Sequence, residues 1–253
     1  MFTRAIVRKP GQSMTDGLRD TDIGIPDHQL ALVQHAAYVE ALKACGLDVL
    51  VLEADESYPD STFVEDTALL TKACAIITNP GALSRKGEIH SIKQVLSDYY
   101  DNIEEVIEPS TVEGGDIMMV GSHFYIGLSE RTNEEGARQV IAYLEKYGFS
   151  GSTMSVGDML HLKSGVVYLE DNTIAATGEF VHQKEFEGFR VLEIAEDESY
   201  AANCIWVNGN VLVAKGYPKA AGTIADAGYP VIELDVSEFR KLDGGLSCLS
   251  LRF

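Results

Sequence analysis

The chain has 253 residues, of which 45% are hydrophobic and 23% are charged, and its formal net charge at pH 7 is −19. A chain of this length can bury a substantial core, and the composition is typical of a water-soluble globular protein. Such an acidic surface argues against binding to nucleic acid or to an anionic membrane, because both require basic patches. It is compatible with a cationic small molecule as the partner.

The N-terminal segment and the cysteines indicate the compartment. The first residues, MFTRAIVRKPGQ, contain no long apolar region and no cleavage signature, so we expect no secretory signal. No apolar run approaches the roughly 20 residues that span a bilayer. The four cysteines form no C-x-x-C pair and no cluster with metal-ligand spacing. We therefore expect a cytoplasmic protein without disulfides and without a metal.

The first part of the chain predicts two groups of strand, helix and strand. Residues 4–7 and 49–52 are strand-like, and residues 29–45 between them are helical in pattern. The next group consists of a strand at 74–78, a helix at 84–100 after a Pro-Gly turn, and a strand at 103–108.

The rest of the chain gives clearer signals. Gly121-Ser122 joins two apolar runs of a hairpin over 116–127, and Asn208-Gly209 is a type I′ turn signal in a hairpin over 204–216. The helix predicted over 131–148 has one apolar face and stops at a glycine. The remaining predicted elements are a strand at 151–156, a hairpin at 165–178 with a poorly signalled helix after it, a helix at 219–228 and a strand at 230–236.

These elements amount to about five modules of hairpin, helix and strand. Self-similarity at roughly 50 residues favours radial repetition around an axis over one continuous sheet. No Gly/Ser-rich linker interrupts the pattern, so we expect residues 1–253 to form a single domain.

Polar side chains stand just before the hairpins, at a similar place in each module. If the modules surround an axis, one strand end from each meets at the centre, and these side chains share one pocket. The principal positions, spaced 42 to 48 residues apart, are Glu65, Glu113, His161, Asn203 and Cys248.

This set of residues can perform nucleophilic chemistry. A thiol such as Cys248 is mostly protonated at neutral pH and becomes a nucleophile when a cation or a histidine favours the thiolate. His161 can act as a general acid or base, and Glu113 can orient its imidazole. Glu65 and Asp66 suit a planar guanidinium, because its fork of donors matches a carboxylate.

Each of these residues also has a structural interpretation. A single cysteine such as Cys248 is most often part of the core, and a single histidine is more often on the surface or satisfied in the core than catalytic. Glu65 and Asp66 could form a turn or a cap. Because the polar residues of the junctions recur together at the module spacing, we favour the functional interpretation.

At these residues the sequence resembles the dimethylarginine dimethylaminohydrolase (dimethylargininase) family of the guanidine-modifying, or pentein, superfamily, and it is most similar to the compact bacterial members. The resemblance extends over essentially the whole chain. Its most specific stretches are PDSTFVEDTALL, NPGALSRKGE, EGGDIMMVGSHFYIGLSERTNEEG, LHLKSGVVYL, ESYAANCIWVN and DGGLSCLSLRF.

The resemblance implies an α/β fold, a five-bladed propeller of ββαβ modules with pseudo-fivefold symmetry and the active site on its axis. It implies that Cys248 is the nucleophile, that His161 is the general acid and that Glu113 is the acid beside it. The substrate-binding residues that it implies are Glu65 and Asp66 for the guanidinium, Arg85 and Arg131 for the α-carboxylate, and Leu18 and Asp60 for the α-amino end.

The implied reaction is hydrolysis of the guanidino C–N bond of Nω-methylated L-arginine to L-citrulline and an amine, through a covalent intermediate on Cys248. It needs no cofactor and no metal, and since family members are often dimers, a homodimer fits it. Other guanidine-modifying enzymes are alternatives, such as an arginine deiminase, an agmatine deiminase, an amidinotransferase or a citrulline-directed hydrolase. Arginine deiminases usually carry an extra helical insertion, for which this chain has no room, and the two arginines argue against agmatine. A non-catalytic pentein-like binding protein would lack the complete Cys-His-acid set.

Overall fold

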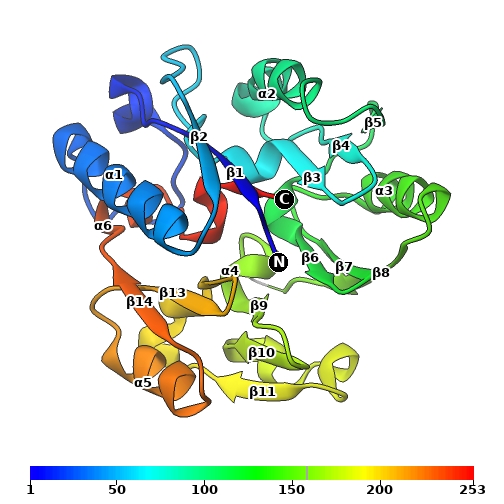
Figure 1. Ribbon diagram of the computed structural model, residues 1–253. Helices are drawn as coiled ribbons and strands as arrows, with labels where there is room; N and C mark the ends of the chain where they lie inside the picture. The colour runs from blue at the N-terminus through cyan, green and yellow to red at the C-terminus, as the bar shows by residue number, and fades with distance from the viewer. Residues whose placement is uncertain (158) are drawn as a thin grey trace.

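Five three-stranded sheets surround a common centre in the computed structural model, which describes residues 1–157 and 159–253 (Figure 1). In every sheet the middle strand pairs with one neighbour antiparallel and with the other parallel. Four sheets use strands that follow one another in the chain. They are β3-β4-β5 (Ala68–Leu70, Ala75–Ile77, Ile103–Glu105), β6-β7-β8 (Ile117–Val120, His123–Leu128, Ser150–Ser155), β9-β10-β11 (Val166–Tyr168, Thr173–Ala176, Arg190–Glu193) and β12-β13-β14 (Ile205–Val207, Asn210–Ala214, Val231–Leu234).

The fifth sheet joins the two ends of the described chain. Strand β15 (Leu251–Arg252) pairs antiparallel with β1 (Arg4–Arg8), which pairs parallel with β2 (Asp48–Leu52). The backbone N–H groups of Thr3 and Arg4 both donate to the carbonyl oxygen of Phe253 at 2.8 Å. The ring of five sheets is therefore closed by hydrogen bonds between the first and last strands, and the predicted five-bladed α/β propeller is confirmed.

Helices form the parallel crossovers in four of the five sheets and lie on the outside of the ring (Figure 1). The N-caps explain where two of them begin: Asp27 accepts hydrogen bonds from the N–H groups of Gln29 and Leu30, and Asn133 accepts one from Gly136. The crossover helices are α1 (His28–Ala44), α2 (Ile89–Leu96), α3 (Glu134–Lys146) and α5 (Pro218–Asp226), and the short helices α4 (Leu162–Gly165) and α6 (Ser237–Arg240) lie in connections.

Two crossovers differ from a regular helix. Before β11 the chain forms 3₁₀ turns at Gly178–His182 and Lys184–Phe186, which agrees with the weak helical signal there. The helix predicted over 84–100 begins as a 3₁₀ helix at Leu83–Glu88 and continues as the shorter α2. This tighter turn places Arg85 and Glu88 where they pair inside the protein at 2.9 Å.

The predicted hairpin at Asn208-Gly209 is confirmed, and both residues have positive φ (50° and 93°), as a type I′ turn requires. The core of the protein is formed where sheets and helices meet; for example, Phe124 of β7 packs in one cluster with Val140 and Leu144 of α3. Among the described residues, no helix has the length and apolarity to cross a membrane.

Candidate active site

A small cavity of about 40 Å³ brings together residues from distant parts of the chain. Of the nine catalytic and substrate-binding residues that the resemblance implies, eight line it: Leu18, Asp60, Asp66, Arg85, Glu113, Arg131, His161 and Cys248. A cavity of this volume holds only a few water-sized molecules.

Cys248 lies in a 3₁₀ turn, Ser247–Leu249, directly before β15. The backbone N–H of Gly245 donates to its sulfur at 3.5 Å. A side chain at Gly245 would put its Cβ 2.4 Å from Oδ1 of Asn203, so only glycine allows this turn to fit. Cys45, Cys74 and Cys204 are buried, whereas Cys248 is partly exposed.

Burial raises the pKa of the Cys248 thiol to about 12, and the negative charges of Glu65 and Asp66 act in the same direction. The hydrogen bond from the N–H of Gly245 and the contact with the hydroxyl of Ser247 oppose this effect but do not cancel it. At neutral pH the free protein therefore holds a neutral thiol, and a positive charge brought into the cavity would favour the thiolate.

His161 is held by a short contact with Glu113, since its Nε2 lies 2.7 Å from Oε2 of that carboxylate. The other carboxylate oxygen of Glu113 accepts a hydrogen bond from the N–H of Gly81 at 3.0 Å. Burial disfavours the imidazolium, but Asp66, Glu113 and Asp116 outweigh burial and raise the pKa of His161 to about 9. His161 is therefore protonated at neutral pH and can donate a proton.

Gly115 and Asp116 fix the position of the histidine ring. A Cβ at Gly115 would lie 2.9 Å from Cγ and Nδ1 of His161, so the ring packs directly on this backbone. Asp116 accepts hydrogen bonds from the N–H of Leu162 at 2.9 Å and from the hydroxyl of Ser129 at 2.7 Å. The segment that carries His161 is thus bound to the start of the neighbouring sheet.

Asp66 and Arg85 form a buried ion pair of 2.7 Å. Burial disfavours the ionised carboxylate, but the charges of Arg85 and His161 lower the pKa of Asp66 to about 2. The guanidinium of Arg85 also donates to Glu88 and to the carbonyl of Phe63, so most of its donors already have acceptors in the protein.

Arg131 is the more available of the two arginines. Its side chain is 20% exposed, compared with 6% for Arg85, and its ion-pair distance to Glu113 is 3.9 Å. The donors of Arg131 are therefore more accessible to an anionic group in the cavity than the donors of Arg85.

One wall of the cavity is a loop that lies over Asp60. The N–H of Leu18 donates to Oδ1 of Asp60 at 3.0 Å. Further along the loop, the N–H of Asp20 and the hydroxyl of Thr21 donate to the two oxygens of Asp243, at 2.5 and 2.6 Å. Asp243 thus fastens the loop over the cavity, and these bonds must break if the loop opens.

The sequence predicts that Glu65 holds a guanidinium, but in the structure its carboxylate contacts other residues of the protein. It does not line this cavity; its carboxylate accepts hydrogen bonds from Nζ of Lys163 at 2.6 Å and from the hydroxyl of Ser247 at 2.7 Å. The reason is local geometry, because Glu65 and Asp66 are successive residues of the 3₁₀ helix Val64–Thr67 and their side chains diverge. In the structure Glu65 thus contacts the segment that carries the cysteine, and its contact with a guanidinium stays a prediction.

Asn203, another of the five junction residues, also contacts that segment. Its side-chain oxygen accepts from the N–H of Ser247 at 3.0 Å, and its amide nitrogen donates to the carbonyl of Lys163 at 2.9 Å. The five junction residues therefore do gather at the centre, but in two layers: three line the cavity, while Glu65 and Asn203 support it.

Sequence reasoning assigned no role to Asp243 or Ser247. Asp243 has a positive φ of 55°, and the Asp-Gly pair that it forms with Gly244 is a turn signal that could have marked it as a special position. Ser247 gave no signal apart from its place beside Cys248.

Three groups in the cavity have atoms close enough for a metal ion: Asp66, Glu113 and His161 lie within 4.8 Å of one another. However, Asp66 is paired with Arg85, Glu113 is bound to Gly81 and His161, and the raised pKa of His161 means that a proton occupies it. We assign no metal to this group.

A five-bladed α/β propeller with a cysteine, a histidine and a glutamate on its axis, beside buried carboxylates and arginines, is a pentein, the guanidine-modifying class of proteins. Comparison with known sequences is more specific. The model of the family "N,N dimethylarginine dimethylhydrolase, eukaryotic" matches residues 21–199. The chain is 55% identical to the N(G),N(G)-dimethylarginine dimethylaminohydrolase of Pseudomonas aeruginosa, with 100% of both chains covered, and 35% identical to the protein of that name from Streptomyces coelicolor, with 98% and 96% covered. The chain belongs to the dimethylarginine dimethylaminohydrolase family.

Solved structures agree with this assignment. The Pseudomonas aeruginosa protein, as a cysteine-to-serine variant complexed with citrulline, has a TM-score of 0.99 at 54% identity with 100% of both chains covered. A histidine-to-glycine variant of a dimethylarginine dimethylaminohydrolase, solved as an adduct with S-methyl-L-thiocitrulline, has the same TM-score, identity and coverage. The N-terminal domain of ArgZ, at 18% identity and a TM-score of 0.90 with 98% of this chain and 97% of that one covered, shows the shared fold.

Proposed function

We propose that this chain hydrolyses Nω-methylated L-arginines to L-citrulline and methylamine or dimethylamine. The observation that carries the proposal is the shared cavity of Cys248 and the His161–Glu113 pair, in a chain 55% identical to a dimethylarginine dimethylaminohydrolase. The raised pKa values of Cys248 and His161 support a thiol nucleophile and a protonated general acid in the resting protein.

The charges of the cavity support a substrate with a cationic head and a carboxylate tail. Asp66 and Glu113 are nearly fully buried, and they offer negative charge where a guanidinium would lie near Cys248. Arg131, with the remaining donor of Arg85, offers positive charge for the α-carboxylate. To the α-amino end we assign the oxygens of Asp60 and the backbone of Leu18, which line the same cavity.

In the first step the substrate cation favours the Cys248 thiolate, and the thiol proton leaves to solvent, because His161 is already protonated. The sulfur attacks the guanidino carbon and forms a tetrahedral adduct. His161 gives its proton to the methylated nitrogen, the C–N bond breaks, and the neutral amine leaves. A covalent S-alkylthiouronium remains on Cys248.

In the second step His161 is neutral and takes a proton from water. The resulting hydroxide attacks the same carbon. The C–S bond then breaks and the hydroxyl proton of the adduct passes to the sulfur, so that citrulline is released with its C=O bond and Cys248 returns to the neutral thiol. One residue thus serves first as acid and then as base, and Glu113 keeps its ring in place for both steps.

The test is a product assay on purified protein with asymmetric dimethylarginine, monomethylarginine, arginine and agmatine, with the amine, ammonia and citrulline or its decarboxylated counterpart measured separately. We expect the largest kcat/KM for a methylated arginine and the smallest for agmatine, which lacks the α-carboxylate. A larger value for arginine would replace this proposal with an arginine deiminase activity. Product from none of the four would leave a binding function.

We also infer that the protein works in a reducing compartment, the cytoplasm, since all four of its cysteines are free and Cys248 must be reduced to act. Oxidation of the purified protein should abolish activity, and dithiothreitol should restore it. Full activity under persistent oxidising conditions would contradict this inference.

A further inference from the structure

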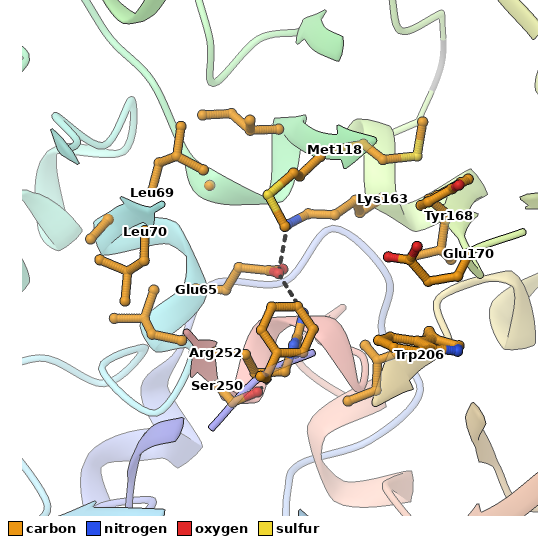
Figure 2. Close-up of a pocket in the computed structure, with 18 residues that line it drawn as sticks. Glu65, Leu69, Leu70, Met118, Lys163, Tyr168, Glu170, Trp206, Ser250 and Arg252 are labelled. Atoms are coloured by element: carbon orange, nitrogen blue, oxygen red, sulfur yellow. Dashed lines mark hydrogen bonds and ion pairs between the residues drawn. The ribbon is translucent and has the colours of Figure 1, made fainter. Parts of the chain in front are cut away.

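A second and larger cavity lies on the other side of Glu65, and we call it the axial cavity. Its volume is about 130 Å³, and its lining includes residues of one strand from each of the five sheets, β3, β6, β9, β12 and β15 (Figure 2). Glu65 is the only one of the nine predicted site residues that lines it. The proposed reaction makes no use of this cavity.

The floor of the axial cavity carries more positive than negative charge. The carboxylate of Glu65 lies between Nζ of Lys163, at 2.6 Å, and Nη2 of Arg252, at 3.6 Å, as Figure 2 shows. All three side chains are at least 86% buried, since their exposed fractions are 6%, 12% and 14%. One carboxylate therefore faces two cations with little access to solvent.

The donors of these cations are only partly used. Nζ of Lys163 makes a single hydrogen bond, to Glu65, within the part of the chain that the structure describes. Arg252 donates from Nη1 to the hydroxyl of Ser250, and its Nη2 lies 3.6 Å from Glu65, beyond hydrogen-bond distance. Buried donors without acceptors cost free energy, so this floor is suited to a ligand with acceptor atoms and a negative charge.

The walls are mainly apolar and aromatic. Leu69 and Met118 lie on one side and Trp206 on another, as Figure 2 shows. A cavity of about 150 Å³ admits a molecule the size of benzene, so the axial cavity is suited to a compact apolar body of similar size. Glu170, exposed beside Trp206, disfavours a second negative charge on the ligand.

From this combination we propose that the axial cavity binds a small organic monoanion, a carboxylate on a compact apolar body, and that the bound anion lowers turnover. The carboxylate would contact Lys163 and Arg252, and the apolar body would pack against Leu69, Met118 and Trp206. This proposal goes beyond the proposed hydrolysis, because the ligand is neither its substrate nor its product.

The contacts of Glu65 connect the axial cavity to the nucleophile. One oxygen of Glu65 binds Lys163, and the other accepts from the hydroxyl of Ser247, the residue before Cys248. An anion beside Lys163 adds negative charge near the sulfur and competes with Glu65 for the ammonium. Both effects disfavour the thiolate that attacks the substrate, because the negative charge of Glu65 already raises the pKa of Cys248 after burial.

Trp206 makes binding directly measurable, since it is the only tryptophan in the chain and it lines the axial cavity. We would titrate the protein with cyclohexanecarboxylate, which is transparent at the excitation wavelength, and follow the fluorescence of Trp206. The matched controls are cyclohexylmethanol, which is neutral, and cyclohexylmethylamine, which is cationic. We expect a saturable change with the carboxylate and none with either control.

Two variants test the location. Leu69→Phe reduces the volume of the cavity, and Arg252→Gln removes one cation. Each should weaken the binding of cyclohexanecarboxylate at least about tenfold. Leu50→Phe on the outer strand β2 and Arg4→Gln on β1 make the same changes at exposed positions outside the cavity and should leave binding unchanged. Equal binding of the neutral alcohol, unchanged binding in both cavity variants, or displacement by citrulline would overturn the site.

The effect on turnover is measured separately at saturating substrate. We expect cyclohexanecarboxylate to lower kcat in the parent protein and in Arg4→Gln but not in Arg252→Gln at the same concentration. A purely competitive pattern, or an unchanged kcat while the fluorescence saturates, would overturn the coupling to the nucleophile. Because fluorescence reports binding without turnover, failure of the proposed hydrolysis would leave the test of the site intact.

Discussion

The candidate active site and the axial cavity share four segments of the chain, at residues 65–66, 113–114, 161–163 and 248–250. In these segments the two cavities differ in which residues face which side. Asp66 lines the candidate active site, while Glu65 lines the axial cavity. In the same way, His161 lines the candidate active site and Lys163 lines the axial cavity. A thin wall made of short 3₁₀ turns and strand ends can thus carry two different surfaces. Side-chain direction, more than position in the sequence, decides the chemistry of each surface.

The two cavities also differ in charge. The candidate active site places the buried acids Asp66 and Glu113 beside a thiol, with the cations Arg85 and Arg131 next to them. The axial cavity has Lys163 and Arg252 around the carboxylate of Glu65, with the exposed Glu170 elsewhere in its lining. The first arrangement suits a cationic head group that must react, and the second suits an anion that is only held. Substitutions on either side of the wall test whether this separation is real.

The largest effect is expected at the nucleophile. Cys248→Ser should lower kcat by more than about 1000-fold, because a hydroxyl has no anionic form near neutral pH, while the denaturation midpoint stays close to that of the parent. Cys45→Ser, at a cysteine that lines neither cavity, is the matched control and should keep full activity. Activity of Cys248→Ser within a few-fold of the parent would exclude it as the nucleophile.

His161→Gly should lower kcat by about 10²–10⁴-fold, since an amine leaves slowly without a proton donor. Intact-mass spectrometry during turnover should detect the covalent adduct on Cys248.

The kcat/KM of the parent should fall as pH rises above about 9, because His161 then loses the proton that it must donate. The pH profile of His161→Gly should lack this fall. A parent profile that keeps rising through pH 10 would contradict the assignment of His161 as the acid.

The same pKa predicts how stability depends on pH. The folded pKa of His161 lies above its ordinary value of 6.5, so the imidazolium stabilises the fold fully below that pH. This contribution is lost as pH rises from about 6.5 to about 9. Urea denaturation across this range should show a steeper loss of stability for the parent than for His161→Gly, and parallel curves would contradict the raised pKa.

A paired substitution separates the two sides of the wall. Asp66→Asn should lower kcat/KM by more than about 100-fold, because it removes the charge next to the reacting group. Glu65→Gln should instead destabilise the fold by about 3 kcal/mol, because it leaves Lys163 and Arg252 without their buried carboxylate, and should change KM by less than about threefold. If Glu65→Gln reduced kcat/KM as strongly as Asp66→Asn with unchanged stability, Glu65 would contact the substrate after all.

The smallest effect is expected at the loop over the candidate active site. Thr21→Val removes one hydrogen bond to Asp243, a loss of about 1 kcal/mol, and should raise KM up to about fivefold by loosening the loop. Thr15→Val, whose hydroxyl bonds within its own turn to the carbonyl of Gln12, is the control. A lower KM in Thr21→Val would show that the fastened loop hinders binding more than it helps.

Much of the fold followed from local patterns, because repeated hairpins and helices of similar length specify a ring. The regular spacing of Glu113, His161 and Cys248 along the chain was enough to predict that they meet in one pocket. The direction of Glu65 could not be predicted, since it depends on how one 3₁₀ helix turns against Lys163 and Ser247, which are distant in the sequence. The role of Asp243 in fastening the loop depends on a contact across more than 220 positions, with no periodic signal.

The closure of the ring by β1 and β15 has a consequence for how the protein becomes reactive. Contacts between Thr3 and Phe253 span 250 positions, and such distant contacts are costly to form early in folding. The turn that carries Cys248 is separated from β15 by one residue, so docking of that strand helps to hold the turn in place, together with the bonds of Asn203 and Glu65 to Ser247. The thiol is made after His161 and the carboxylates and joins them only on folding, so a chain in which β15 has not docked carries the cysteine without the groups that control its charge.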